Sequence, residues 1–88
     1  MTMNGKTTNS KLLVKMQNSE GSLERVIAKV RESHFQVRNL SARLSIDESI
    51  FFLTLEVEGE GQTAGLTSRI GELNEVKTIE VANPYAAA

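Results

Sequence analysis

The 88-residue sequence contains no cysteine and no tryptophan, and it has only one histidine and one proline. The absence of cysteine excludes a disulfide framework and any thiolate metal site, and His34 alone cannot supply an imidazole cluster, so structural zinc is excluded. The longest apolar run is residues 50–53, far below the roughly 18 residues that span a bilayer, and the N-terminus lacks a signal-peptide core. We therefore expect a cytoplasmic protein.

The charges are balanced, with ten basic residues against eleven acidic ones and a formal net charge of -1. This balance leaves no electrostatic footprint for a polyanion, so nucleic acid is not expected as a partner. The length suits one core and is too short for two domains. A domain this small buries only about 60 to 65% of its unfolded surface, so a partner subunit would add stability.

Composition divides the chain into three segments. Residues 1–10 are polar and have no apolar period, which predicts a flexible N-terminal arm. Residues 11–82 carry the apolar periodicities of one domain. Residues 83–88, which begin with Asn-Pro, form a C-terminal tail.

Periodicities of two and of 3.6 residues predict six elements within the domain. The predicted elements are a strand over 11–17, a helix carrying Leu23, Val26, Ile27 and Val30, strands over 39–46 and 51–58, a helix carrying Leu66, Ile70 and Leu73, and a strand over 76–81. Ser19 is the expected N-cap of the first helix, because its hydroxyl could accept from a free amide. Asp47, Glu48 and Ser49 are expected to form the turn of a hairpin.

The order strand, helix, strand, strand, helix, strand predicts an α+β fold, the ferredoxin-like βαββαβ sandwich. A right-handed crossover then gives a four-stranded antiparallel sheet with two helices on one face. Many unrelated functions use this architecture, so the fold alone does not name one.

Several functions of this architecture lack the side chains that they need. RNA binding needs an aromatic platform on the outer sheet face, where only Phe52 is expected. Acyl phosphate hydrolysis needs an arginine in the loop after the first strand, but Arg25 lies a turn inside the helix. The alternating glutamates Glu56, Glu58 and Glu60 are more typical of a solvated face than of a calcium site. His34 could act as a base, but we interpret it as a helix-capping residue with positive φ.

Residues 17–26, which read Q-N-S-E-G-S-L-E-R-V, resemble the entry of an ACT domain from acetohydroxyacid synthase regulatory subunits. In that family the pattern is N-E-x-G-A-L-x-R-V, and the positions that match it are Asn18, Gly21, Leu23, Arg25 and Val26. The segments 34–37 and 66–76 resemble the family's G-[FY]-N-I motif and its second helix. The likeness covers about residues 11–81 and the length of the short, single-ACT form. Ser19, His34 and Gln36 depart from the family's acidic residue, glycine and asparagine.

The resemblance implies a non-catalytic regulatory subunit, which binds and activates the catalytic subunit of acetohydroxyacid synthase in branched-chain amino acid biosynthesis. Thiamine diphosphate, Mg²⁺ and FAD would belong to that catalytic subunit, and no cofactor is expected in this chain. The family's effector, here valine, leucine or isoleucine, would bind at a homodimer interface. The implied contacts are Asn18, Ser19, Glu20, Gly21, Ser22 and Leu23 of one chain with Gln36 and Val37 of the other.

The loop chemistry agrees with such a site, because a helix N-terminus presents free amides to a carboxylate and Gly21 permits close approach. The alternative is that the glycine merely turns the chain. Two other functions stay open: a free-standing amino-acid sensor that controls another enzyme or regulator, and a dimeric structural protein without a ligand. Arg25 is interpreted as a solvated or salt-bridged residue.

Two surfaces are expected to carry contacts. The second strand should lie at a sheet edge, where the short side chains of Asn39 and Ser41 would permit pairing into an eight-stranded dimer. The sheet face away from the helices should expose Leu13, Ile50 and Phe52, which we interpret as a docking patch for the catalytic subunit. Scattered exposed apolar side chains are the ordinary alternative.

Overall fold

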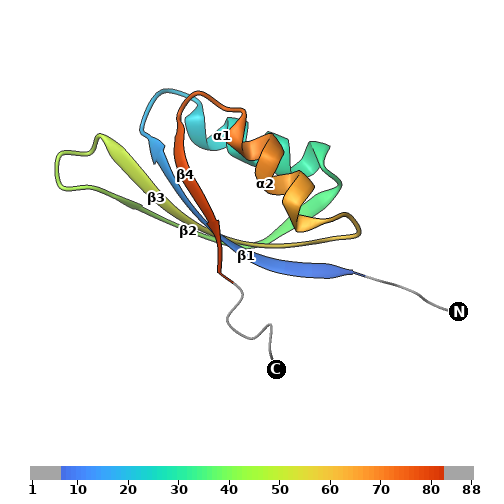
Figure 1. Cartoon of the computed structure of the whole chain (residues 1–88). Helices are drawn as coiled ribbons and strands as arrows, with labels where there is room; N and C mark the ends of the chain where they lie inside the picture. The colour runs from blue at the N-terminus through green and yellow to red at the C-terminus, as the bar shows by residue number, and fades with distance from the viewer. Residues whose placement is uncertain (1–6, 83–88) are drawn as a thin grey trace, which may run out of the picture.

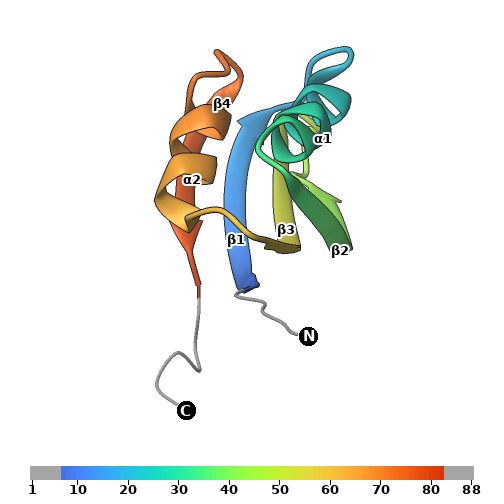
Figure 2. The ribbon, with the colours of Figure 1, turned by 90° about the vertical axis from the view of Figure 1, so that its right-hand side faces the viewer.

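The computed structural model describes residues 7–82, which form one antiparallel sheet covered on one face by two helices (Figure 1). The elements in chain order are β1 (Thr8–Gln17), α1 (Ser22–Glu32), β2 (Phe35–Leu44), β3 (Ile50–Gly59), α2 (Thr63–Gly71) and β4 (Val76–Val81). The sheet order is β2-β3-β1-β4. The predicted ferredoxin-like fold is confirmed, and Figure 2 shows both helices on the same side of the sheet.

The core lies between the sheet and the helices. In β1, Leu12, Val14 and Met16 are buried, as their alternation predicted. Opposite them α1 contributes Val26 and Val30. The remaining buried apolar side chains are Phe35, Leu53, Leu55, Val57, Leu66 and Ile70. Each such side chain contributes about 1.5 to 3 kcal/mol on burial, which is why the helices lie on this face only.

The first strand begins earlier than the apolar pattern indicated. β1 starts at Thr8, so residues 8–10, which the sequence placed in a flexible arm, are paired with β3. Ser10 is buried, and its hydroxyl shares a hydrogen bond of 2.6 Å with the hydroxyl of Thr63 at the start of α2. Because this contact is polar, the apolar alternation of the sequence did not indicate that the strand extends to these residues. The rest of the predicted arm, residues 1–6, and the predicted tail, residues 83–88, lie outside the described residues.

The predicted bounds of the second strand, residues 39–46, were wrong at both ends. β2 begins at Phe35, and its pairing with β3 shifts register between Val37 and Asn39, so Arg38 is the extra residue of a β-bulge. The bulge moves the inward-facing positions from odd to even numbers, which broke the alternation on which the prediction relied. The strand ends at Leu44, and Ile46 lies in the turn instead.

Both ends of α1 are set by residues with positive φ. Gly21 is the N-cap, with φ 77 and no side-chain cap, so the prediction of Ser19 as N-cap was wrong. Ser19 instead accepts a hydrogen bond through its carbonyl from the Ser22 amide, at 3.0 Å. At the other end His34 has φ 66, and its amide bonds to the Arg31 carbonyl. The interpretation of His34 as a capping residue is confirmed.

Candidate functional site

The β1–α1 loop, which carries the sequence motif, is tied to the β2–β3 hairpin. The amide of Asn18 donates to the Ser49 carbonyl at 2.9 Å, and its side-chain Nδ2 donates to the Glu48 carbonyl at 2.8 Å. Glu48 has φ 64, so the side chain of Asn18 supports a turn residue in a sparsely populated conformation. Asn18 therefore holds two loops together within one chain.

Gly21 is explained by the backbone. Its φ of 77 lies in the left-handed region, which favours glycine, and a Cβ there would lie 2.9 Å from Nη1 of Arg25. The glycine thus permits both the turn into α1 and the close approach of the arginine side chain. Its presence is accounted for without a ligand.

Arg25 forms an ion pair with Glu75 in the α2–β4 loop. The same guanidinium donates from Nη2 to the Glu20 carbonyl at 3.0 Å, and the Glu75 carbonyl accepts from the Gln17 amide at 2.8 Å. A hydrogen bond from its own backbone amide, followed by the one from Arg25, lowers the pKa of the Glu75 carboxyl. The interpretation of Arg25 as a salt-bridged residue is confirmed, and the pair joins the β1–α1 loop to the α2–β4 loop.

The next two motif residues face the interior. Ser22 is 1% exposed, and its hydroxyl has no hydrogen-bond partner among residues 7–82. Leu23 is half-buried and packs against the core. Ser19 is half-buried and Glu20 is exposed. Of the predicted contacts over 18–23, Ser22 alone is fully buried, Asn18 and Glu20 are exposed, and Ser19, Gly21 and Leu23 are half-buried.

Gln36 and Val37 lie at the other end of the sheet from this loop. Gln36 pairs with Glu58 near the end of β3, whereas Gln17, just before the loop, pairs with Ile50 at its start. Val37 is half-buried and packs against the core. One chain therefore does not bring the two groups of predicted ligand contacts together.

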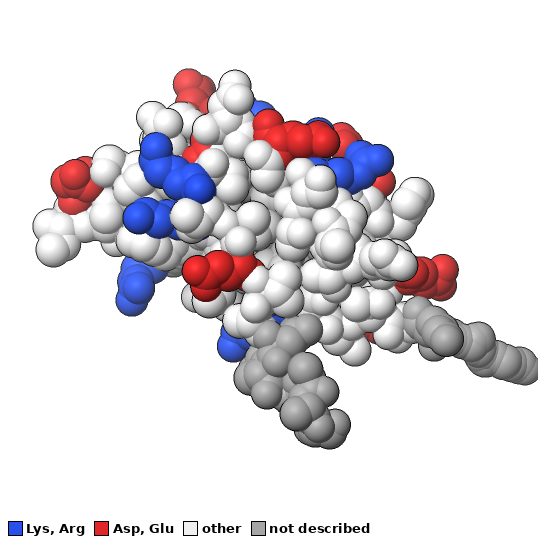
Figure 3. Space-filling model, viewed as in Figure 1, with Lys and Arg blue, Asp and Glu red and all other residues white. Residues whose placement is uncertain are grey.

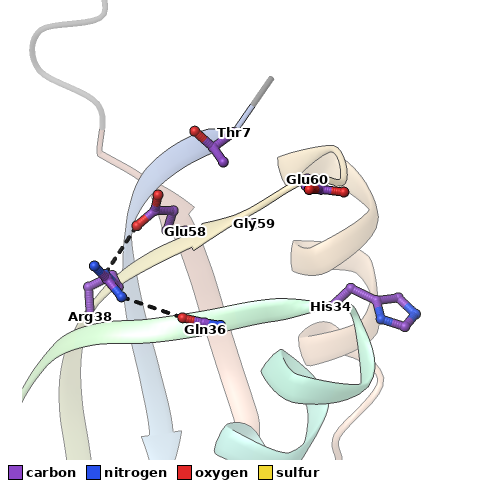
Figure 4. Close-up of a pocket in the computed structure, with 7 residues that line it drawn as sticks. All are labelled: Thr7, His34, Gln36, Arg38, Glu58, Gly59 and Glu60. Carbon is purple, nitrogen blue, oxygen red and sulfur yellow. Dashed lines mark hydrogen bonds and ion pairs between the residues drawn. The ribbon is translucent and has the colours of Figure 1, made fainter. Parts of the chain in front are cut away.

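The beginning of β2 instead lines an open hollow of about 390 Å³ that the sequence did not reveal (Figure 4). Its lining residues are Thr7, His34, Gln36, Arg38, Glu58, Gly59 and Glu60. At one end of the hollow Arg38 pairs with Glu58 at 3.1 Å and bonds weakly to Gln36 at 3.4 Å (Figure 4). Arg38 is the bulge residue, and no sequence signal marked the bulge except the change in apolar phase between Val37 and Leu40.

The outer sheet face holds the predicted docking residues together. Leu13 and Phe52 are 37% and 38% exposed, and Ile50 is half-buried on the same face. Phe52 pairs with Lys15 on one side and with Arg43 on the other, whose guanidinium lies 5.7 Å from the ring centroid. The patch is therefore apolar with a basic border. On the side shown in Figure 3, acidic and basic side chains are interspersed.

Residues 7–82 contain no cluster of three or more metal-ligating side chains. Within the same range, no helix has the length and apolar content needed to cross a membrane. On the helix layer, Nζ of Lys29 forms ion pairs with Glu32 and Glu72, each at 3.8 Å.

Comparison with solved structures identifies the fold. The ACT domain of GTP pyrophosphokinase from Chlorobium tepidum superposes with a TM-score of 0.74 over 88% of this chain and 100% of that one, at 11% identity, in its crystal structure. Its solution structure gives a TM-score of 0.67 at 14% identity. The chain has the ACT-domain fold. A formyltetrahydrofolate deformylase from Pseudomonas putida contains a similar ACT-like region, with a TM-score of 0.65 at 17% identity over 29% of its length. No protein-family model and no curated protein sequence matches.

Proposed function

We propose that this ACT-fold chain is a non-catalytic regulatory subunit, which binds and activates the catalytic subunit of acetohydroxyacid synthase. The observation that carries the proposal is the place of the motif. The segment 18–26 that resembles those regulatory subunits forms the β1–α1 junction of an ACT fold, with Gly21 and Arg25 in defined backbone and ion-pair roles. The likeness to solved structures supports the fold, and the motif supports the choice of partner enzyme.

The test is to measure acetolactate formation by the purified catalytic subunit with and without this chain. The proposal expects a saturable increase in rate at a fixed stoichiometry. An unchanged rate, together with no detectable complex, would rule the proposal out.

The outer face is the proposed contact with the catalytic subunit, because Leu13, Ile50 and Phe52 form one patch there. Phe52→Glu should abolish activation and leave the circular dichroism spectrum unchanged, since the ring is already partly in water. Ser68→Glu, at an exposed position of α2 on the opposite layer, is the matched control. Full activation by Phe52→Glu would leave the patch without this role.

The chain is further proposed to act as a symmetric dimer through β2, which is an edge strand. Antiparallel pairing about Ala42 would set Leu40 opposite Leu44 of the partner subunit, so apolar side chains would meet on the helix side. The same pairing reverses the partner's strand and brings its Gln36 to the end that holds the Asn18–Leu23 loop. That arrangement supports an effector site shared between two chains, which one chain cannot form.

Binding of an effector is tested by calorimetry with valine, leucine and isoleucine, in the presence and in the absence of the catalytic subunit. If an amino acid bound to the isolated chain with measurable heat, but the chain had no effect on the synthase, the alternative of a free-standing amino-acid sensor would be favoured. Sedimentation at tens of micromolar, a range set by ordinary homodimer affinities, tests the dimer. A monomer at that concentration would remove the shared site as well.

A further inference from the structure

The tip of the β2–β3 hairpin presents one apolar side chain entirely to solvent. Ile46 is 104% exposed, whereas the next most exposed large apolar side chain among the described residues, Val81, is 47% exposed. Figure 1 shows the hairpin extending at the left past the ends of both helices, so neither helix covers its tip. An isoleucine at this place contributes nothing to the core of its own chain.

The turn that carries Ile46 is held by several hydrogen bonds. The Ser45 amide donates to the Ile50 carbonyl and the Glu48 amide to the Ser45 carbonyl, both at 2.9 Å. Asp47 Oδ1 accepts from the hydroxyls of Ser45 and Ser49 at 2.8 Å and from the Ser49 amide at 3.1 Å.

A second set of bonds fixes the turn to the body of the domain. Asn18 of the β1–α1 loop donates to the carbonyls of Ser49 and Glu48, as described above. An exposed tip with this many bonds loses little conformational entropy when it is bound. The turn therefore presents Ile46 from a backbone that is already ordered before binding.

The border of Ile46 is acidic. Asp47 and Glu48 follow it directly and are exposed, and the segment 44–49 has no basic residue. Figure 3 shows red and uncharged surface side by side at the left end of the molecule, over this hairpin. An apolar side chain with carboxylates beside it is complementary to an apolar pocket with a basic rim. A second copy is a less suitable occupant. In the dimer proposed above, pairing about Ala42 would set Ile46 beside Arg38 of the partner subunit, and the hollow at that place is lined by polar side chains and a glycine rather than by apolar ones.

We infer that the hairpin tip is a second docking element, in which Ile46 enters an apolar pocket with a basic rim on the catalytic subunit. This inference rests on the proposed function. It adds to the outer-face patch a contact at the adjacent end of the sheet, since Ile50, at the edge of that patch, bonds through its amide to the Ser45 hydroxyl at 3.1 Å. The second contact would thus lie on the turn that leads into β3, and the first on β1 and β3 themselves.

The test measures the dissociation constant for the catalytic subunit with Ile46→Ser, Ile46→Val and the unchanged chain. Ile46→Ser should raise the constant by about tenfold or more, as loss of an anchoring side chain does. Its melting temperature should not change, because the side chain has no contact to lose. Ile46→Val, which keeps an apolar branched side chain, should bind nearly as the unchanged chain does.

A second pair of variants tests the contribution of the acidic side chains beside Ile46. Glu48→Gln should weaken binding and reduce its salt dependence, whereas Glu32→Gln, an exposed glutamate at the far end of α1, should do neither. Unchanged affinity of Ile46→Ser, while Phe52→Glu abolishes binding, would overturn the inference and leave the proposed function standing. No binding by the unchanged chain would overturn both.

Discussion

Gly59 is the position at which a single added methyl group should test the packing of β2 most directly. It is the last residue of β3 and pairs with Phe35, the first residue of β2. A Cβ at Gly59 would lie 2.7 Å from the carbonyl oxygen of His34 and 2.7 Å from Cγ of Phe35. Neither neighbour can move easily, because one is backbone and the other is a ring that is 2% exposed.

The magnitude follows from overpacking a buried site, which typically costs about 1 to 3 kcal/mol. In a domain of this size each kcal/mol lowers the melting temperature by about 4 to 8 °C. Gly59→Ala should therefore melt well below the unchanged protein. Gly65→Ala is the matched control, because a Cβ at this position in the first turn of α2 meets nothing within 4 Å. It should stabilise the protein by about 0.5 to 1 kcal/mol through helix propensity.

The assay is urea unfolding followed by circular dichroism for the two glycine variants and the unchanged chain. A lower midpoint for Gly59→Ala with an unchanged slope would show a loss of stability without a change in the surface exposed on unfolding. If Gly59→Ala unfolded at the same urea concentration as the unchanged chain, the close contact between Gly59 and Phe35 would be refuted. The start of β2, and with it the position of Gln36, would then need another explanation.

Three further predictions concern the loops. Ser22→Ala should raise stability by up to about 1 kcal/mol in the same unfolding assay, because it removes a buried hydroxyl without a partner; a lower midpoint would show that the hydroxyl is bonded. Gly21→Ala should lower the free energy of unfolding by about 1 to 2 kcal/mol, because residue 21 has a φ of 77, and Gly21→Asn should lower it less. Equal stability of the two variants and the unchanged chain would exclude the left-handed conformation. Stability should fall in acid, because the pKa values of Asp47, bonded chiefly by the Ser49 hydroxyl, and of Glu75 are lowered from 3.8 and 4.5. That contribution is complete above these ordinary values and is lost as pH falls through the lower folded values; Glu75→Gln should flatten the melting temperature measured against pH, and an unaltered profile would contradict this.

The strands with an uninterrupted alternation could be predicted from the sequence. In β1 the period of two reflects burial directly, since Leu12, Val14 and Met16 face the helices without a break. β2 could not be bounded in this way, because the bulge at Arg38 changes the phase and Phe35 then stands out of register with Leu40. A strand that changes phase gives two short alternations, and each is too brief to be identified alone.

The start of α1 and the hollow beside Arg38 could not be predicted from the sequence either. A serine near the start of a helix usually caps it through its hydroxyl. In α1 the N-cap is instead Gly21 in the left-handed conformation, and nothing in the sequence shows that the glycine rather than Ser19 caps the helix. The hollow beside Arg38 depends on which residues face each other across β2 and β3, and that register depends on the bulge. The outward positions of Phe52 and Leu13 could be predicted, because they follow from the same alternation that places the core.

The motif residues of the β1–α1 loop can be explained either by effector binding or by the needs of the fold, and their contacts within one chain help to separate the two explanations. Asn18 supports the hairpin turn, Gly21 supplies the left-handed entry to α1, and Arg25 binds Glu75. Each contact is complete within one chain, so selection for the fold alone would keep these residue types. A chain that regulates only by docking would thus retain the motif without any effector. Gly21→Asp separates the two explanations. It should abolish an effector response, because the aspartate blocks approach to the helix amides. Apart from the loss of stability caused by its backbone conformation, it should leave activation through the outer face intact.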